Sequence, residues 1–372
     1  MSKLNVDISD KPYDIWIKKG LQNEVANFLS SNTSNPKVLI VTDEYFSSGY
    51  AQELSNKLTD TGFDTDIYVM PGGKISKTFN EVLKLYGLLE TKDYARDSTI
   101  IAVGGGVVGD LAGFVASTWY RGMNLVHMPT TLMGMVDSSV GGKVAINFRD
   151  TINAVGNYYH PIANFMDLDF ITTLPDRDYI SGLAEVVKCG LIADTELLDF
   201  LSNNSESILN KDQQHLVHCI KRSLEIKIDH VKGDIKESGK RLLLNYGHTI
   251  GHAIEMATQT DKHELLRHGE GVALGISAVL ELGEKHLNFS ETKSDYARDI
   301  LTKLKLPVSL QSYDLELESS ELIKKVMKLM HKDKKRKANQ IRFVLLDELG
   351  SADTYSGIDN SIIQKACEKV IL

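Results

Sequence analysis

The sequence predicts an α/β N-terminal domain with a parallel sheet, followed by a mainly α-helical C-terminal domain. Three observations support this fold class. The chain has 372 residues, which is more than one hydrophobic core usually serves. In its first half, short apolar runs alternate with longer amphipathic stretches. From about Pro175 onward, long helical patterns dominate.

Short apolar runs in the first half predict the strands of the sheet. Helical stretches separate several of them, and this alternation is typical of parallel strands joined by crossover helices. In such architectures, ligands bind at the carboxyl ends of the strands. Strands are expected at 38–41, 67–70, 99–103 and 125–128.

The second half predicts helices almost throughout, with one later strand at 341–346. The change of pattern places the domain boundary between 172 and 178. The expected domains are 1–175 and 176–372. Helices are expected at 179–201, 213–230, 249–258, 271–286 and 319–331.

Charge and composition exclude several classes of partner. The net charge of −8 disfavours nucleic-acid binding, for which a basic face is the usual requirement. No apolar run approaches the roughly 20 residues of a membrane span, and the first residues contain no apolar signal core. The three cysteines are far apart, which indicates free thiols rather than a disulfide framework. We therefore expect a cytoplasmic protein without membrane contact.

A glycine-rich segment, GGGVVGD at residues 104–110, directly follows the strand expected at 99–103 and opens a helical stretch. It satisfies the G-x-G-x-x-G pattern, in which glycines let the backbone approach a pyrophosphate and the helix N-terminus offers unpaired N–H groups. The usual fingerprint lies on the first strand and has an acid about 20 residues later, whereas the acid here follows at once. A tight turn between strand and helix is the alternative interpretation. The candidate cofactor residues are Gly104, Gly105, Gly106, Gly109 and Asp110.

Glutamate and histidine residues of the helical half are candidate metal ligands. Glu185 and Lys188 lie on one helical face, and so do His248 and His252. His268 opens a further helical stretch. Zinc accepts imidazole nitrogen and carboxylate oxygen, and catalytic sites keep three protein ligands and an open position. Spacing alone favours His248 and His252 as joint ligands. A surface ion pair, a core histidine pair and a helix-start histidine are the alternatives.

Basic and amide side chains near these segments are candidate anion-binding groups. Lys143 follows two glycines, as in an anion-binding loop, and Arg241 and Asn245 lead directly into the histidine segment. Arg121 and Lys227 belong to the same set. Taken singly, each is more simply explained as a solvated charge or amide. Their concentration around the glycine loop and the histidines favours a small anionic substrate.

Six segments combine these candidate residues: 104–110, 126–131, 137–143, 182–188, 245–255 and 268–275. In their order and spacing they resemble the dehydroquinate synthase family of sugar-phosphate cyclases. The resemblance extends over roughly residues 37–350, and six linked motifs make a chance match implausible.

The resemblance implies bound NAD and zinc, with cobalt as a possible substitute. It assigns the metal to Glu185, His248 and His268 and gives His252 to the phosphate of the substrate, against the interpretation from spacing. The implied NAD contacts are Asp43, Lys77, Gly104, Gly105, Gly106, Gly109, Asp110, Thr130, Thr131 and Lys143.

The resemblance also implies a substrate site and a homodimer. Arg121 matches an arginine that the family contributes across a dimer interface. One of Lys334 and Lys335 matches an active-site lysine of the family. The implied substrate contacts are Asp137, Lys143, Asn153, Lys188, Lys227, Arg241, Asn245 and His252.

The activity implied by the resemblance is that of a phosphate-eliminating carbon–oxygen lyase. A seven-carbon keto acid phosphate is transiently oxidised with NAD, loses phosphate by elimination and is reduced again by the same cofactor. It then closes to a carbocycle by an intramolecular aldol reaction. In the family, this reaction serves the shikimate pathway of aromatic amino acid biosynthesis.

Two positions depart from the family pattern. Lys74 stands where the family usually has a glutamate in an early NAD-binding loop, and Ile152 stands where a lysine usually precedes Asn153. Both positions concern the cofactor. They leave open the affinity for NAD, the choice between NAD and NADP, and a specialised substrate.

Three alternatives to this activity stay open. A 2-deoxy-scyllo-inosose synthase forms a product without a carboxylate, and Arg241 and Asn245 argue against it. A metal-dependent polyol dehydrogenase of the related iron-alcohol-dehydrogenase type shares the two-domain plan and releases reduced cofactor. A degenerate paralogue would bind nucleotide without turnover.

Overall fold

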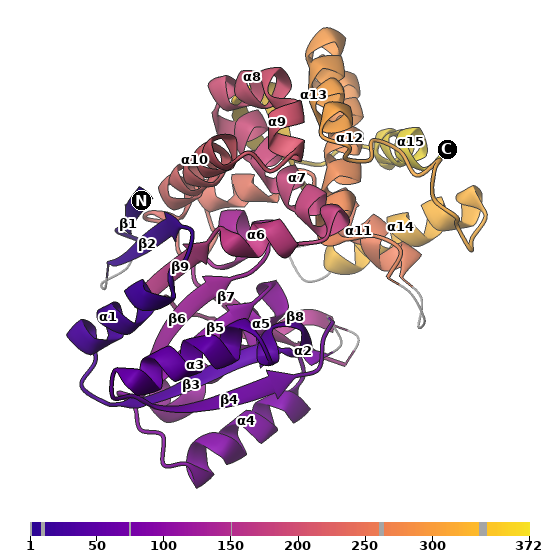
Figure 1. Ribbon diagram of the computed structural model, residues 1–372. Helices are drawn as coiled ribbons and strands as arrows, with labels where there is room; N and C mark the ends of the chain where they lie inside the picture. Colours follow the sequence, from indigo (N-terminus) through magenta and orange to yellow (C-terminus); the bar gives the residue numbers. More distant parts are fainter. Residues whose placement is uncertain (1, 9–11, 74–75, 150, 260–263, 335–340) are drawn as a thin grey trace. The chain divides into compact units, whose positions relative to one another are not determined.

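The structure is a computed structural model that describes residues 2–8, 12–73, 76–149, 151–259, 264–334 and 341–372. Contacts between residues divide the chain into two compact units, Met1–Leu174 and Pro175–Leu372. Figure 1 shows the ribbon with its helices and strands labelled.

Among the described residues of the first unit, a seven-stranded sheet has the order β1-β2-β9-β6-β5-β3-β4. β1 pairs antiparallel with β2, and every other neighbouring pair is parallel. The predicted parallel sheet is confirmed, and the four expected strands correspond to β3, β4, β5 and β6. The strands are β1 (Ser2–Val6), β2 (Tyr13–Lys18), β3 (Lys37–Asp43), β4 (Asp64–Met70), β5 (Thr99–Gly104), β6 (Asn124–Pro129) and β9 (Ala163–Asp167).

Both faces of this sheet are buried, which explains why its central strands are apolar at nearly every position. Leu39 and Val41 of β3 lie in one core cluster with Leu85 of α4 and Leu111 of α5. The alternate residues of β3 point to the opposite face because side chains alternate along a strand. The helices are α1 (Gln22–Asn32), α2 (Glu44–Ser47), α3 (Tyr50–Asp60), α4 (Phe79–Thr91), α5 (Gly106–Thr118) and α6 (Asp169–Thr173).

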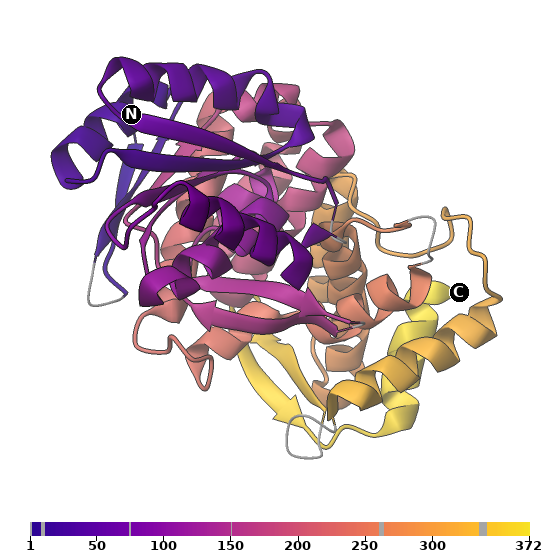
Figure 2. The same ribbon diagram turned by 90° about the horizontal axis from the view of Figure 1, so that it is seen from below.

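A hairpin that the sequence analysis did not predict packs beside α5 (Figure 2). Its strands are β7 (Lys143–Phe148) and β8 (Thr151–Tyr158), and the π-helical turn η3 (Gly134–Ser138) precedes them. Gly113 of α5 permits this packing, because a Cβ there would lie 2.4 Å from Val144 Cγ1.

The second unit is mainly helical, as predicted. The single helix expected at 179–201 is wrong, because the chain forms two helices that meet at Asp194. This residue has an extended backbone (φ −157°, ψ 96°), and its side chain accepts a hydrogen bond from Leu197 N at 3.1 Å. It therefore caps a new helix. The helices are α7 (Asp176–Ala193), α8 (Thr195–Asn203), α9 (Ser205–Leu209), α10 (Gln213–Val231), η4 (Lys240–Asn245), α11 (His248–Thr258), α12 (His268–Leu287), α13 (Glu291–Lys303), α14 (Ser319–Lys334) and α15 (Asn360–Ile371).

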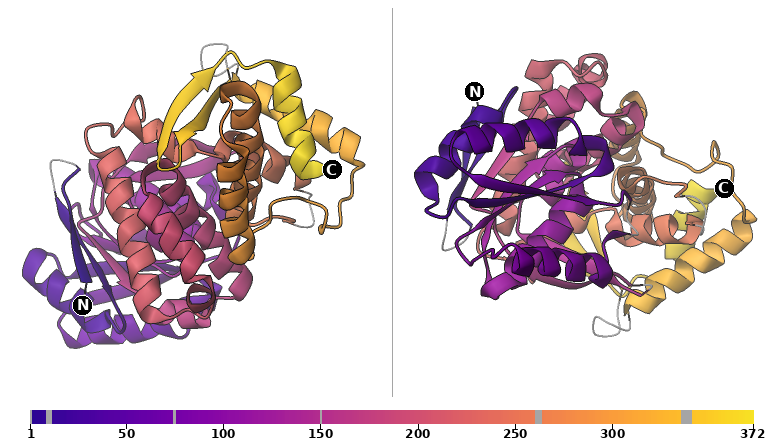
Figure 3. Two further views of the ribbon diagram at one scale, coloured as in Figure 1. Left: turned by 90° about the horizontal axis from the view of Figure 1, so that it is seen from above. Right: turned by 60° about the horizontal axis from the view of Figure 1, so that its bottom comes forward.

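The late strand expected at 341–346 is present as part of an antiparallel hairpin, β10 (Arg342–Glu348) and β11 (Ser351–Ser356). The long helix α12 lies between this hairpin and α15 in the packing of the unit (Figure 3). Within the described ranges, none of the helices combines the length and the apolar character that a membrane span requires.

Candidate active site

The predicted cofactor residues of the first unit lie at the carboxyl ends of neighbouring parallel strands. Asp43 ends β3, Gly104 ends β5 and Thr130 follows β6. From β3 the chain continues to β4 on one side and then crosses to β5 on the other side, so the strand order reverses between β3 and β5. In open α/β sheets, ligands bind at such a switch point.

The glycine loop packs closely on the segment that follows β6. A Cβ at Gly105 would lie 3.4 Å from Thr131 Cγ2, and a Cβ at Gly106 would lie 3.0 Å from Ser138 Oγ. Gly105 is the N-cap of α5, and within the described part of the chain this helix start has no side-chain cap. The first N–H groups of α5 are thus available to an anion such as a pyrophosphate. Ser138, which lies against the glycine loop, was not among the predicted site residues.

A buried lysine links two other predicted site residues of the first unit. Lys77 Nζ donates to Asp110 Oδ2 at 2.6 Å and to Asn153 Oδ1 at 2.5 Å. Only 7% of the Lys77 side chain is exposed. The structure therefore brings Lys77, Asp110 and Asn153 together. Asp137 lies in η3, and Lys143 begins β7 with an exposed side chain.

Arg121 lies in a strained turn on the surface of the first unit. Tyr120, Arg121 and Gly122 have φ values of 46°, 65° and 125°. Such values are costly for residues with a Cβ, and strain of this kind is often retained at functional sites. The side chains of Tyr120 and Arg121 are exposed. In the described part of the chain, no ion pair of Arg121 is found.

Four side chains from three helices converge in the second unit. Glu185 comes from α7, His248 and His252 from α11, and His268 from α12. His248 Nε2 lies 3.4 Å from Glu185 Oε1, and His268 Nε2 lies 3.8 Å from the same atom. One ring nitrogen from each of the three histidines lies within 4.8 Å of the others. The cluster thus offers two possible sets of three metal ligands. Both contain His248 and His268, and the third ligand is either Glu185 or His252.

The Glu185 carboxylate has the environment of a metal ligand. Its side chain is 1% exposed. Lys188 Nζ forms an ion pair with Oε2, whereas Oε1 has no hydrogen-bond partner among the described residues. A buried oxygen without a hydrogen bond that faces two imidazole nitrogens is satisfied by a divalent cation. Burial opposes the charge of this group, but Lys188, His248 and His268 hold the pKa of Glu185 well below its usual value. At neutral pH it is the carboxylate that a metal requires.

The second ring nitrogens of two histidines are held by protein acceptors. His248 Nδ1 lies 3.1 Å from Tyr246 O, and His268 Nδ1 lies 3.2 Å from Glu255 Oε2. A histidine that binds metal through Nε2 usually donates from Nδ1 to such a group, which fixes the ring and its tautomer. No such bond of His252 is found among the described residues, and its side chain is exposed. These contacts favour a site of Glu185, His248 and His268.

Glycines allow the three helices to approach closely enough to form this cluster. A Cβ at Gly275 of α12 would lie 1.9 Å from Gly247 O at the start of α11. A Cβ at Gly269 of α12 would lie 1.7 Å from Ser181 O of α7. Helix α12 therefore touches the backbone of both neighbours. These glycines were not among the predicted site residues, although their density around the histidines is a signal in the sequence.

The predicted substrate-binding cations of the second unit are buried, which is uncommon for lysine and arginine. Lys188, Lys227 and Arg241 are 2%, 6% and 2% exposed. One nitrogen of the Arg241 guanidinium donates to Ile235 O at 2.7 Å. Asn245 Nδ2 donates to a carboxylate oxygen of Glu237 at 2.6 Å. The loop that precedes η4 thus provides a hydrogen-bond acceptor for both Arg241 and Asn245.

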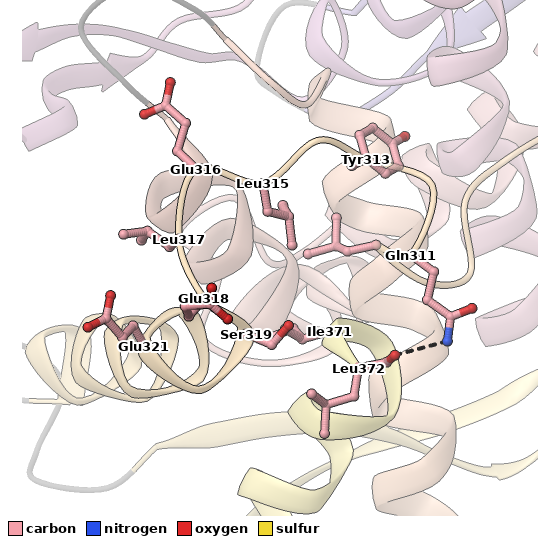
Figure 4. Close-up of a pocket in the computed structure, with 11 residues that line it drawn as sticks. Gln311, Tyr313, Leu315, Glu316, Leu317, Glu318, Ser319, Glu321, Ile371 and Leu372 are labelled. Atoms are coloured by element: carbon pink, nitrogen blue, oxygen red, sulfur yellow. Dashed lines mark hydrogen bonds between the residues drawn. The ribbon is translucent and has the colours of Figure 1, made fainter.

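A surface pocket of about 480 Å³ is formed by another part of the second unit (Figure 4). The segment 310–321 and the last two residues line it, and Gln311 Nε2 donates to Leu372 O at 2.9 Å. None of the predicted site residues that the structure describes is among those that line it, and its glutamates do not suit an anionic substrate. The predictions for Lys74, Lys335 and the side chain of Lys334 fall outside the described part of the chain.

The fold matches solved sugar-phosphate cyclases over nearly the whole chain. A crystal structure of 2-deoxy-scyllo-inosose synthase, complexed with carbaglucose-6-phosphate, NAD⁺ and Co²⁺, matches 99% of this chain and 100% of its own. Its TM-score is 0.87 at 23% sequence identity. A structure of 2-epi-5-epi-valiolone synthase from Streptomyces hygroscopicus, with NAD⁺ and Zn²⁺ bound, matches 98% of each chain with a TM-score of 0.86 at 24% identity. The protein has the fold of the sugar-phosphate cyclases.

Sequence comparison narrows this class to one family. Residues 67–181 match the family model of the 3-dehydroquinate synthase N-terminal domain, and residues 182–336 match that of the C-terminal domain. A 3-dehydroquinate synthase from Ruminiclostridium cellulolyticum is 38% identical over 98% of this chain and 98% of its own. The chain belongs to the 3-dehydroquinate synthase family.

Proposed function

We propose that this protein converts 3-deoxy-D-arabino-heptulosonate 7-phosphate into 3-dehydroquinate and phosphate, as a 3-dehydroquinate synthase of the shikimate pathway. One observation carries the proposal: in a chain of this family, the buried Glu185 carboxylate faces the Nε2 atoms of His248 and His268. The proposed cofactors are NAD and Zn²⁺ or Co²⁺, the species bound in the solved cyclases.

Residues of the first unit are proposed to hold the dinucleotide. The N–H groups at the start of α5 and the hydroxyls of Thr130 and Thr131 suit a pyrophosphate, and Asp43 suits the hydroxyl groups of a ribose. Lys77 holds the Asp110 carboxylate in place. When bound, NAD exchanges a hydride with the substrate, and the divalent ion acts as a Lewis acid on the oxygen of the reacting alcohol.

Residues of the second unit are proposed to hold the charged groups of the substrate. The Arg241 guanidinium can bind a carboxylate through two parallel hydrogen bonds, and Lys188 and Lys227 add positive charge. The exposed ring of His252 is assigned to the phosphate, with Asn245 as an amide partner. Because these cations are buried and held by neighbouring groups, they orient the substrate with little rearrangement.

Phosphate release without net reduction of NAD tests the proposed function. Because the hydride returns to the substrate in every cycle, one phosphate should be released per turnover with substoichiometric NAD. Phosphate and the absorbance of NADH are to be followed in one reaction with the heptulosonate phosphate. Steady accumulation of NADH would contradict a cyclase and support a polyol dehydrogenase. NAD binding without release of phosphate would support a degenerate paralogue.

Arg241 should determine the preference for an acidic substrate. Removing one partner of a desolvated charged pair costs about 2–5 kcal/mol, so Arg241→Gly should lower kcat/KM for the heptulosonate phosphate by more than about tenfold. Turnover of glucose 6-phosphate, which has no carboxylate, should change little. The neighbouring exposed residue provides the control Lys240→Gly, which should leave both activities unchanged. A wild-type preference for glucose 6-phosphate would assign the chain to the inosose synthases.

We further propose that the protein is a homodimer in which Arg121 serves the site of the partner. Exposed apolar side chains on the first unit support this proposal. Phe79 and Phe148 are 39% and 46% exposed and their ring centroids lie 6.0 Å apart. Leu83, one turn further along α4, is 64% exposed, and Tyr120 beside Arg121 is 59% exposed. Apolar surface of this kind often marks a protein–protein interface.

The dimer should have twice the chain mass of 41.3 kDa in sedimentation equilibrium. Leu83→Glu should shift the protein toward the monomer. If Arg121 acts in the partner's site, mixing inactive Arg121→Ala and His268→Ala subunits should restore about a quarter of the wild-type activity, since half of the dimers gain one complete site. No recovery from subunits that exchange would mean that Arg121 acts within its own chain.

The proposed location is the cytoplasm. Among the described residues, Cys189, Cys219 and Cys367 are buried thiols that take part in no disulfide, which is compatible with a reducing compartment.

A further inference from the structure

The β7–β8 hairpin contains an irregular bulge that carries Asn153. The ladder pairs the two residues on either side of Asn147 with Val155 and Thr151. One residue of β7, Asn147, is therefore opposite three residues of β8, 152–154. Bulges of this kind redirect a side chain and are frequent beside active sites.

Asn147 connects the two sides of this bulge by hydrogen bonds. Its backbone N–H donates to Lys77 O at 2.8 Å, and its side-chain Oδ1 accepts from Asn153 N at 3.0 Å. Asn153 Oδ1 accepts from Lys77 Nζ at 2.5 Å. These bonds form a closed ring through three residues. Asp110 is attached to this ring through the same lysine nitrogen, at 2.6 Å.

The ring determines the orientation of the Asn153 amide. A lysine ammonium can only donate, so the Asn153 atom that faces Lys77 is the carbonyl Oδ1. The Nδ2 group donates to no acceptor among the described residues, and the side chain is exposed. It is thus available to an oxygen atom of a ligand. Asn153 also has a left-handed backbone (φ 53°), which the bond from its N–H to Asn147 helps to stabilise.

We propose that Asn147 is a positioning residue, which holds the bulge so that the Asn153 Nδ2 group is presented to an oxygen atom of the sugar-phosphate substrate. The proposal rests on the proposed function and on the substrate contact that the family resemblance implies for Asn153. Lys77 shares its ammonium group between Asn153 and Asp110. The ring therefore also connects the substrate-binding amide to a cofactor-binding carboxylate.

Amide hydrogen exchange tests the positioning role without any turnover. Asn147→Ala removes the acceptor of the Asn153 N–H, so exchange in peptides that cover 151–156 should become about three- to tenfold faster. Asn147→Asp keeps an acceptor oxygen and should exchange like the wild type. Asn157→Ala, later on β8, is the matched control. Unchanged exchange in Asn147→Ala would refute the positioning role, whether or not the protein is a cyclase.

Steady-state kinetics test the link to the substrate. Asn147→Ala should raise KM for the heptulosonate phosphate about three- to tenfold, with kcat and the Kd for NAD nearly unchanged. Because Asn147 acts through Asn153, the double variant Asn147→Ala/Asn153→Ala should behave like Asn153→Ala alone, and multiplicative effects would overturn the proposal. Asn153→Asp keeps the oxygen that faces Lys77 but loses the donor, so it should also raise KM.

Two further outcomes distinguish a failure of this proposal from a failure of the proposed function. If Asn147→Ala does not fold, an unchanged KM in Asn153→Asp would still refute the Nδ2 contact. If the wild-type protein does not turn over the heptulosonate phosphate, the proposed function fails, while hydrogen exchange still decides the role of Asn147.

Discussion

The variant His268→Ala is expected to purify without tightly bound metal. Tightly bound zinc contributes about 10–16 kcal/mol in sites with four protein ligands, so one ligand accounts for roughly a quarter, and its loss should weaken affinity about 100-fold or more. The Nε2 atom of His268 lies 3.8 Å from Glu185 Oε1. Affinity for NAD should remain, because the proposed nucleotide contacts belong to the first unit. Metal analysis and competition with a chelator provide the measurement.

The matched control for this experiment is His252→Ala. His252 belongs to the same cluster, but its ring lacks the Nδ1 partner that His248 and His268 have among the described residues. The variant His252→Ala should therefore retain one metal per chain. It should lose activity because the proposed contact with the substrate phosphate is removed. If metal is retained in His268→Ala but lost in His252→Ala, the metal is not bound by Glu185, His248 and His268. The ligands would then include His248 and His252.

The variant Gly275→Ala is expected to lose about 3 kcal/mol of stability, together with its metal. A Cβ there would lie 1.9 Å from Gly247 O and 2.7 Å from Gly251 N, both backbone atoms of α11 or its first turn. Because backbone atoms cannot rotate away as a side chain can, the two helices must separate, and overpacking of this kind costs roughly 1–3 kcal/mol or more. Separation also moves His248 away from His268. Chemical unfolding and the metal content of the folded protein measure both effects.

Gly283→Ala on the same helix separates packing from helix propensity. A Cβ at Gly283 would lie 3.6 Å from Phe289 Cβ, an ordinary contact distance. Replacing glycine by alanine within a helix favours the helix by about 1 kcal/mol. Gly283→Ala should therefore be neutral or more stable than the wild type and should retain its metal. If Gly275→Ala and Gly283→Ala change stability and metal content equally, the close backbone contact at Gly275 is not required for the metal site.

Local periodicity predicts those parts of the fold whose pattern is complete within one segment. Strands β3, β4, β5 and β6 are buried on both faces and therefore read as apolar runs, and the long helices of the second unit show their period over several turns. Strand β9 escapes prediction because it is defined by pairing with β2 and β6, which are distant in sequence. The break at Asp194 also escapes, because a capping hydrogen bond interrupts an apolar pattern that continues through it.

In the candidate site, too, the sequence predicts some features and only the three-dimensional contacts decide others. The sequence identifies Glu185, His248, His252 and His268 as residues of the right chemistry, and the resemblance to a family selects three of them. Spacing along the chain favours His248 with His252, since both lie on one face of α11. The three-dimensional contacts favour His248 with His268, because Tyr246 O and Glu255 Oε2 orient those two rings.

The sequence by itself determined the class of the protein: a parallel α/β unit with a glycine loop at the end of a strand, a helical unit, and the residue types of a metal and anion site. These properties depend on local periodicity, on the small size of glycine and on side-chain chemistry. Only the tertiary structure decided which atoms meet. Glu185, His248 and His268 lie on three helices whose approach depends on Gly269 and Gly275, and Asn147 reaches Asn153 through a bulge that neither strand encodes alone. The helix contacts arise between backbones distant in sequence, and the Asn147–Asn153 bond depends on how two strands pair, so no local pattern can specify either.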